Sequence, residues 1–78
     1  GDSKLTVYPN PTSDYFQITG LTGLRYVELF SIVGNKVKSF DAAPQRQYFV
    51  GDLNEGIYLV RLMDSTKKIL KTVRLSIR

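Results

Sequence analysis

The sequence contains no cysteine and no histidine. Disulfides, thiolate or imidazole metal ligands, and every catalytic scheme that uses cysteine or histidine are therefore excluded. The lack of cysteine does not assign a compartment, because exported proteins can also do without it. The chemistry that remains is that of carboxylates, amines, hydroxyls and aromatic rings.

Long apolar runs are also missing. No stretch approaches the ~18–20 apolar residues of a membrane helix, so membrane insertion is not expected. The first residues show no signal-peptide pattern, and an exported domain of this kind would need a signal upstream. We interpret residues 1–4 as a linker or cloning remnant and expect a single domain over residues 5–78.

The composition is that of an ordinary small globular domain. The 78 residues are 42% hydrophobic and 23% charged, with a net charge of +4. A chain of this size buries only about 60–65% of the surface that its unfolded form exposes, so its stability margin is expected to be thin. The positive charge is compatible with an anionic partner, but solubility explains it equally well.

Short segments of alternating apolar and polar residues follow one another along the whole chain and predict strands. Turn formers such as Pro9-Asn10-Pro11 and Gly34-Asn35 separate them. Seven short strands with turns every ~8–12 residues predict an all-β, immunoglobulin-like β-sandwich with mainly antiparallel strands. The expected strands are Leu5–Tyr8, Tyr15–Thr19, Tyr26–Ser31, Lys36–Phe40, Gln45–Val50, Gly56–Met63 and Lys67–Arg78.

Two local features accompany these strands. Asn10, held between two prolines, is expected to bond nearby backbone through its side chain. In the last strand the apolar alternation changes phase, and a β-bulge near Leu70-Lys71 would restore it. That strand carries five of the eleven basic residues and no acidic one. Its lysines and arginines are either a solvated strand face or a docking surface.

Catalytic and metal-binding patterns are weak. The seven carboxylates fall mostly in turns, and a domain this small has little room for a cleft with paired carboxylates. The segment Asp52–Gly56 only weakly resembles a calcium loop and is better explained as a turn. We therefore predict no enzymatic activity, no cofactor and no metal site.

Exposed aromatic residues would support a different function, that of an adhesive or carbohydrate-binding β-sandwich module appended to a secreted enzyme. Such a module needs a flat row of exposed rings, for which Tyr15, Tyr26 and Phe49 are the candidates. Nucleic-acid binding is not expected, because the basic residues are spread over at least four segments without a recognised motif. Long edge strands would allow a homodimer of the isolated domain.

Several motifs in order carry a family resemblance: Val7-Tyr8-Pro9-Asn10-Pro11, Val27–Phe30 leading into Gly34–Val37, Leu53–Leu62, and a basic closing strand. Together they resemble the type A C-terminal sorting domain of proteins exported by the type IX (Por) secretion system of Bacteroidetes. The resemblance covers about Leu5 to Arg78.

The resemblance implies a folded secretion signal at the end of a cargo protein. The cargo would reach the periplasm and then be recognised by the outer-membrane translocon. A cell-surface sortase would cut ahead of the domain, leaving the cargo at the cell surface or secreted. The domain would act as substrate and ligand, with the translocon, the sortase and the upstream cargo domain as partners.

The resemblance also assigns residues. Translocon recognition is expected in the terminal strand, at Lys67, Lys68, Lys71, Thr72, Val73, Arg74, Leu75, Ser76, Ile77 and Arg78. The remaining family-motif residues are expected to be structural: Tyr8, Pro9, Asn10, Pro11, Gly34, Gly56 and Tyr58.

Overall fold

A computed structural model describes residues 4–20 and 23–78. Of the expected linker over residues 1–4, only Lys4 is among the described residues. In the loop after Gly20, residues 21–22 lie outside them. No helix in the described part of the chain has the length and hydropathy needed to cross a membrane.

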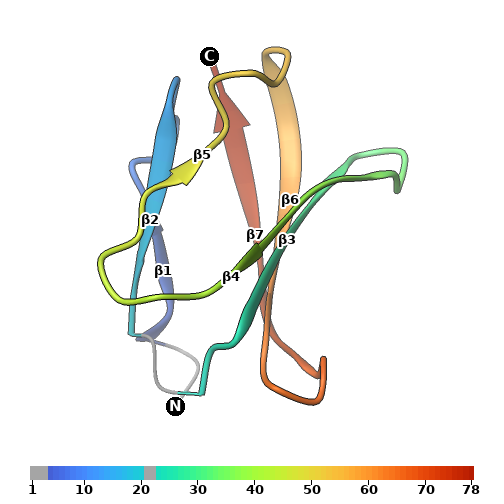
Figure 1. Cartoon of the computed structure of the whole chain (residues 1–78). Helices are drawn as coiled ribbons and strands as arrows, with labels where there is room; N and C mark the ends of the chain where they lie inside the picture. Colours follow the sequence, from blue (N-terminus) through green and yellow to red (C-terminus); the bar gives the residue numbers. More distant parts are fainter. Residues whose placement is uncertain (1–3, 21–22) are drawn as a thin grey trace.

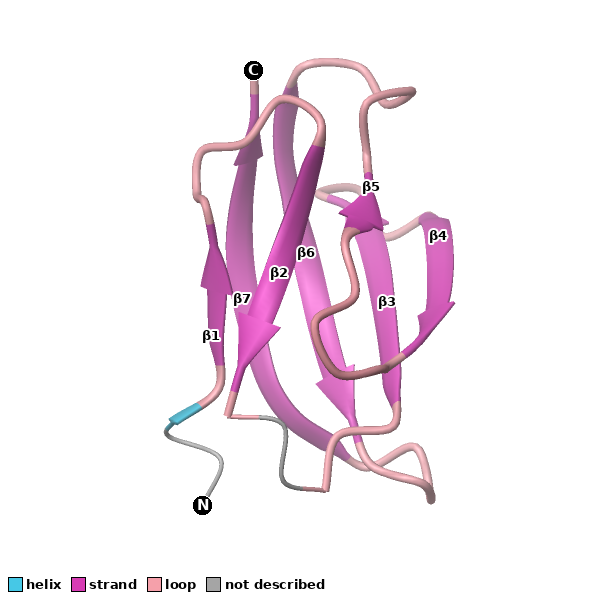
Figure 2. Cartoon of the chain, turned by 60° about the vertical axis from the view of Figure 1, so that its left-hand side comes forward, coloured by secondary structure: helices cyan, strands magenta, loops and turns pink. Residues whose placement is uncertain are grey.

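The described residues form seven strands in two antiparallel sheets that face each other (Figures 1 and 2). One sheet has the order β1-β2-β5 and the other the order β4-β3-β6-β7. The predicted β-sandwich is thereby confirmed. The strands are β1 (Thr6–Tyr8), β2 (Tyr15–Thr19), β3 (Tyr26–Ser31), β4 (Lys36–Asp41), β5 (Tyr48–Phe49), β6 (Gly56–Met63) and β7 (Ile69–Ile77).

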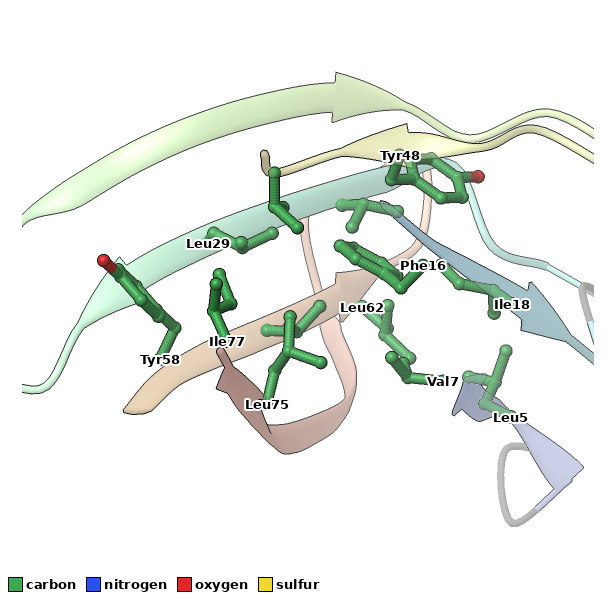
Figure 3. Close-up of a cluster of buried hydrophobic side chains, with 13 residues drawn as sticks. Leu5, Val7, Phe16, Ile18, Leu29, Tyr48, Tyr58, Leu62, Leu75 and Ile77 are labelled. Atoms are coloured by element: carbon green, nitrogen blue, oxygen red, sulfur yellow. The ribbon is translucent and has the colours of Figure 1, made fainter. Parts of the chain in front are cut away.

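The core lies between the sheets, where alternate side chains of facing strands meet (Figure 3). Phe16 of β2 stacks on Tyr48 of β5, with ring centroids 5.1 Å apart. Phe40 of β4 meets the Tyr48 ring edge-on at 5.3 Å, which joins the two sheets through aromatic contacts. Leu53, in the connection before β6, packs against the end of this core.

The predicted bulge is present in the last strand. Leu62 pairs with Lys71 and Met63 pairs with Ile69, so Leu70 is the extra residue. Leu70 then packs against the core, whereas Ile69 stays 47% exposed. Beyond the bulge, Leu75 and Ile77 both point into the core. An extra residue thus corrects the phase of the apolar pattern, as a period of two requires.

Candidate functional site

The terminal strand β7 is an edge strand, because the sheet order places it last beside β6. Its other side faces the segment that joins β1 to β2. Edge strands expose unpaired backbone groups that pair with other chains unless something covers them. What covers the edge of β7 therefore decides how much of it a partner could use.

Asn10 covers part of that edge. Its Nδ2 donates to the carbonyl of Arg74 at 2.7 Å, and its Oδ1 accepts from the amide of Ser76 at 3.0 Å. The side-chain amide thus pairs with β7 as a backbone peptide unit would. The expectation that Asn10 bonds nearby backbone is wrong, because its partners lie 64 and 66 residues further along the chain.

Thr12 continues the cover toward the end of the strand. Its amide donates to the carbonyl of Ser76 at 2.9 Å, and its carbonyl accepts from the amide of Arg78 at 2.9 Å. Thr12 and Ile77 accordingly form a parallel bridge. Within the described residues, no such backbone or amide cover reaches Thr72, so the middle of the strand keeps an open edge.

The predicted recognition residues fall into three groups. Leu75 and Ile77 are buried, and Val73 is partly buried against the core. Lys71 reaches across to the N-terminal segment, where its Nζ donates to the carbonyl of Leu5 at 2.7 Å. Half-buried Ser76 receives the bond from Asn10, and the exposed members of the set are Lys67, Lys68, Thr72, Arg74 and Arg78.

Among the exposed residues, Lys67 has partners of its own. Its ammonium lies 3.6 Å from the Glu28 carboxylate and 4.6 Å from the centroid of the Tyr26 ring. Glu28 also pairs with Lys36 at 3.4 Å. Lys67 is engaged at the far end of the sheet, and Lys68 lies in the same β6–β7 turn. Thr72 and Arg74 of β7, with Arg78 directly after the strand, remain as the exposed residues of the set.

Several of the family-motif residues lie in turns or in the core, whereas Tyr8 is 41% exposed. Both peptide bonds that precede Pro9 and Pro11 are cis. Gly34 has a φ of 97° in the β3–β4 turn, a conformation that L residues rarely adopt. The Tyr58 ring is buried, and its hydroxyl donates to the carbonyl of Asn54 at 2.7 Å, which ties the connection before β6 to the core.

The candidate aromatic row differs from the one expected. Tyr15 and Phe49 are cross-strand neighbours and are 38% and 52% exposed. Tyr26 belongs to the other sheet, where it contacts Arg25 and Lys67, so it is not part of this row. Tyr8, 41% exposed, takes its place, because its partner Gln17 is two residues from Tyr15 along β2.

A pocket of about 360 Å³ adjoins this aromatic face. Its lining includes Pro9, Pro11, Asp14, Tyr15 and Gln17. Sequence spacing could have paired Tyr15 with Phe49 only if the β2–β5 register had been known. The sequence did contain one usable signal: Tyr8 and Tyr15 each stand next to an apolar residue that is buried, so both tyrosines are expected on the outer face.

Two carboxylates have perturbed acidity, and both lie in turns. A hydrogen bond from Lys38, at 2.7 Å from Asp52, holds the pKa of Asp52 below its usual range. The hydrogen bond from Thr66, followed by backbone amides of the β6–β7 turn, lowers the pKa of Asp64. Both arrangements stabilise turns. In the described part of the chain no three acidic side chains gather as a metal site would require.

Comparison with protein families matches residues 6–76 to the family described as the secretion system C-terminal sorting domain. Comparison with curated proteins finds no match. The match spans all seven strands apart from the last residue of β7. This chain therefore belongs to the family of C-terminal sorting domains of the type IX secretion system.

Proposed function

We propose that the folded domain directs its cargo to the type IX outer-membrane translocon through the exposed side of β7, and that a cell-surface sortase then removes it. A domain of this family is attached to a cargo and interacts with the secretion machinery of Bacteroidetes. On this proposal the cargo passes through the periplasm and ends at the cell surface or outside the cell.

The observation that carries the proposal is the position of β7 at the edge of the four-stranded sheet. Its open stretch around Thr72 would let a partner strand add by backbone hydrogen bonds. Arg74 is exposed beside that stretch, Arg78 is exposed after the covered end of the strand, and both would attract an acidic translocon surface. Asn10 and Thr12 already occupy the backbone edge from Arg74 onward, which limits strand addition to the first half of β7.

An export assay tests this role. Residues 1–78 are fused behind a fluorescent protein that carries an inner-membrane export signal, with native upstream linker restored. The fusion is expressed in a Bacteroidetes host with and without a working translocon. Translocon-dependent appearance of the fusion outside the cell is expected, and periplasmic retention of a folded fusion in both hosts would refute the sorting role.

Charge reversal then tests the surface. Arg74→Glu with Arg78→Glu should reduce export severalfold, because the variant would repel an acidic translocon surface. The domain should stay folded, since exposed charges on a strand contribute little to stability. Lys4→Glu with Arg25→Glu makes the same change in net charge at exposed positions away from this surface. Equal export of the Arg74→Glu, Arg78→Glu variant and the Lys4→Glu, Arg25→Glu control would show that Arg74 and Arg78 are not recognised by the translocon.

The aromatic face supports a second candidate function, glycan binding. Tyr8, Tyr15 and Phe49 lie on the outer face of the three-stranded sheet beside a pocket that contains Asp14 and Gln17. Rings that stack on sugars and polar groups that bond their hydroxyls are what such a site needs. A glycan-array screen of the wild-type domain and of Tyr15→Ala with Phe49→Ala would decide; no binding by the wild type would dismiss this function.

A further inference from the structure

The β3–β4 hairpin presents two apolar side chains to solvent at its tip. Ile32 is 71% exposed and Val33 is 81% exposed. The next most exposed large apolar residue in the described part of the chain is Phe49, at 52%. Val37 adds to the same hairpin at 38% exposed. A pair of adjacent aliphatic residues this open to water requires an explanation.

The tip is held rigidly by backbone hydrogen bonds. The amide of Gly34 donates to the carbonyl of Ser31 at 2.9 Å, and the amide of Ser31 donates to the carbonyl of Asn35 at 2.8 Å. The Ser31 hydroxyl also accepts from the amide of Asn35. This is a three-residue hairpin loop that ends in a positive-φ residue. Ile32 and Val33 are thus fixed in place on a stiff turn.

The β6–β7 hairpin is a twin of this turn. The amide of Lys67 donates to the carbonyl of Asp64 at 3.0 Å, and the amide of Asp64 donates to the carbonyl of Lys68 at 3.0 Å. Lys67 has the positive φ, at 69°. Ser65 and Thr66 occupy the positions that Ile32 and Val33 hold in the other hairpin.

The twin shows that this loop geometry has no need of apolar residues. Turn positions favour residues such as Ser, Asn, Asp, Gly and Pro, and Ser65-Thr66 follows that rule. Ile32 and Val33 break it, with the two β-branched side chains mostly outside any contact in the domain. Residues that break a local rule without a structural gain mark functional sites.

The two hairpins lie at opposite ends of the four-stranded sheet (Figure 1). Ser31, just before the apolar tip, pairs with Tyr58, and Gly56 pairs with Ile77, so the tip is at the end where β7 finishes. Only β6 separates β3 from β7, a distance of about 10 Å between strand axes. The apolar tip and the end of β7 that leads to Arg78 therefore lie at the same end of the four-stranded sheet.

The other end of the sandwich is where the chain enters the domain. Leu5 lies there beside Lys71, which pairs with Leu62 near the polar hairpin. In a C-terminal sorting domain the cargo precedes β1, so the cargo joins at the polar end. The apolar tip points away from it and is accessible to a large partner.

We propose that Ile32 and Val33 insert as a pair into an apolar pocket of the type IX translocon, next to the surface that binds β7. This inference rests on the proposed sorting function. Two stiff, β-branched side chains on a rigid turn match a shaped protein pocket, because little ordering entropy is lost when they bind. Two aliphatic residues without an aromatic neighbour at the tip give too small an apolar area for stable bilayer binding.

Exchange of the two loops tests the proposal. Ile32→Ser with Val33→Thr gives the apolar hairpin the polar loop of its twin, and Ser65→Ile with Thr66→Val makes the reverse change as a matched control. Fluorescently labelled 78-residue chain is titrated against detergent-solubilised type IX outer-membrane translocon and, separately, against protein-free vesicles of phosphatidylethanolamine and phosphatidylglycerol. The fusions of the export assay carry the same changes.

The loss of the apolar pair should weaken translocon binding about tenfold or more and reduce export, as removal of a buried anchor does. The control should bind as the wild type does. The Ile32→Ser, Val33→Thr variant should keep the wild-type melting temperature, and Val33→Thr alone serves if it melts lower. The control should melt slightly lower than the wild type, because Thr66→Val removes the hydroxyl that donates to Asp64; Ser65→Ile alone keeps that bond and serves as a second control.

Each other outcome overturns the proposal. Wild-type affinity and export in the Ile32→Ser, Val33→Thr variant would remove the hairpin from the interface while the sorting function stands. Binding to vesicles that is lost in the Ile32→Ser, Val33→Thr variant would show that the hairpin tip inserts into lipid and not into a pocket of the translocon. Failure of the wild-type domain to bind the translocon and to be exported would refute the sorting function, and this inference with it.

Discussion

Replacement of Asn10 by alanine should loosen the attachment of the N-terminal segment to the terminal strand. The side chain makes two hydrogen bonds to β7, one as donor to Arg74 and one as acceptor from Ser76. Both join segments that are far apart in the sequence and belong to different sheets. Their loss therefore reduces the stability of the folded state and uncovers the edge of β7.

The size of the effect follows from the two bonds and their exposure. A neutral hydrogen bond contributes about 0.5–1.5 kcal/mol net, so the pair contributes about 1–3 kcal/mol. Water replaces the amide at this exposed edge, which favours the lower part of that range, about 1–2 kcal/mol. For a domain of this length, 1 kcal/mol lowers the melting temperature by about 4–8 °C, so a decrease of about 5–15 °C is expected.

Urea unfolding followed by tyrosine fluorescence, together with amide hydrogen exchange, measures both consequences. The Ser76 amide should exchange faster in Asn10→Ala, because its acceptor is gone. Asn10→Asp is the control of equal size: it keeps an acceptor for Ser76 but lacks the donor for Arg74. Wild-type stability and a still protected Ser76 amide in Asn10→Ala would refute the reasoning.

Three further predictions concern the turns and the chain end. Asp64→Ala should destabilise the domain at pH 7; since folding lowers the pKa of Asp64, its contribution is full above the unfolded pKa and is lost as pH falls through the folded one, so melting curves of the two proteins should converge below about pH 3.8. Gly20→Ala should cost more stability in urea unfolding than Gly34→Ala, which should cost about 1–2 kcal/mol. Both glycines have positive φ, but an added Cβ at Gly20 would lie 2.5 Å from the Lys4 carbonyl oxygen, whereas Gly34 has open space. Deletion of residues 76–78 removes the buried Ile77 side chain and should reduce the free energy of unfolding by about 2–5 kcal/mol. Thermal unfolding followed by circular dichroism should then show a sharply lowered melting temperature, and a deletion variant that melts as the wild type does would contradict this.

Local pattern was sufficient to predict most of the fold. The alternation of Tyr15–Thr19 has a period of two, which is typical of a half-buried strand, and Phe16 and Ile18 are the buried residues there. The same rule located the bulge, because Leu70 was out of phase with Leu75 and Ile77 and one extra residue restores the register. These features depend on neighbours in the sequence, so the sequence alone determines them.

Pairings between distant segments could not be predicted in this way. The partners of Asn10 lie on a strand more than sixty residues away, and no local rule connects them. The aromatic row likewise depends on which strands become neighbours: β2 lies between β1 and β5, which brings Tyr8 and Phe49 to Tyr15 and leaves Tyr26 on the other sheet. The order of strands in a sheet depends on contacts between segments that are distant in the sequence, so local sequence patterns do not predict it.

The two functions proposed for β7, packing and recognition, explain why the folded domain would be the signal. Leu75 and Ile77 fix the strand from its inner side, and Asn10 fixes part of its edge. Only with these contacts made does Arg74 stand beside the open stretch of backbone at Thr72, and Arg78 at the same end of the sheet as the apolar hairpin tip. In an unfolded chain Ile32 is separated from Arg74 by more than forty residues, so their joint surface does not exist. A translocon that binds both elements would therefore select cargo whose terminal domain has folded. The arginines, the open edge of β7 and the apolar hairpin tip come together only in the folded domain.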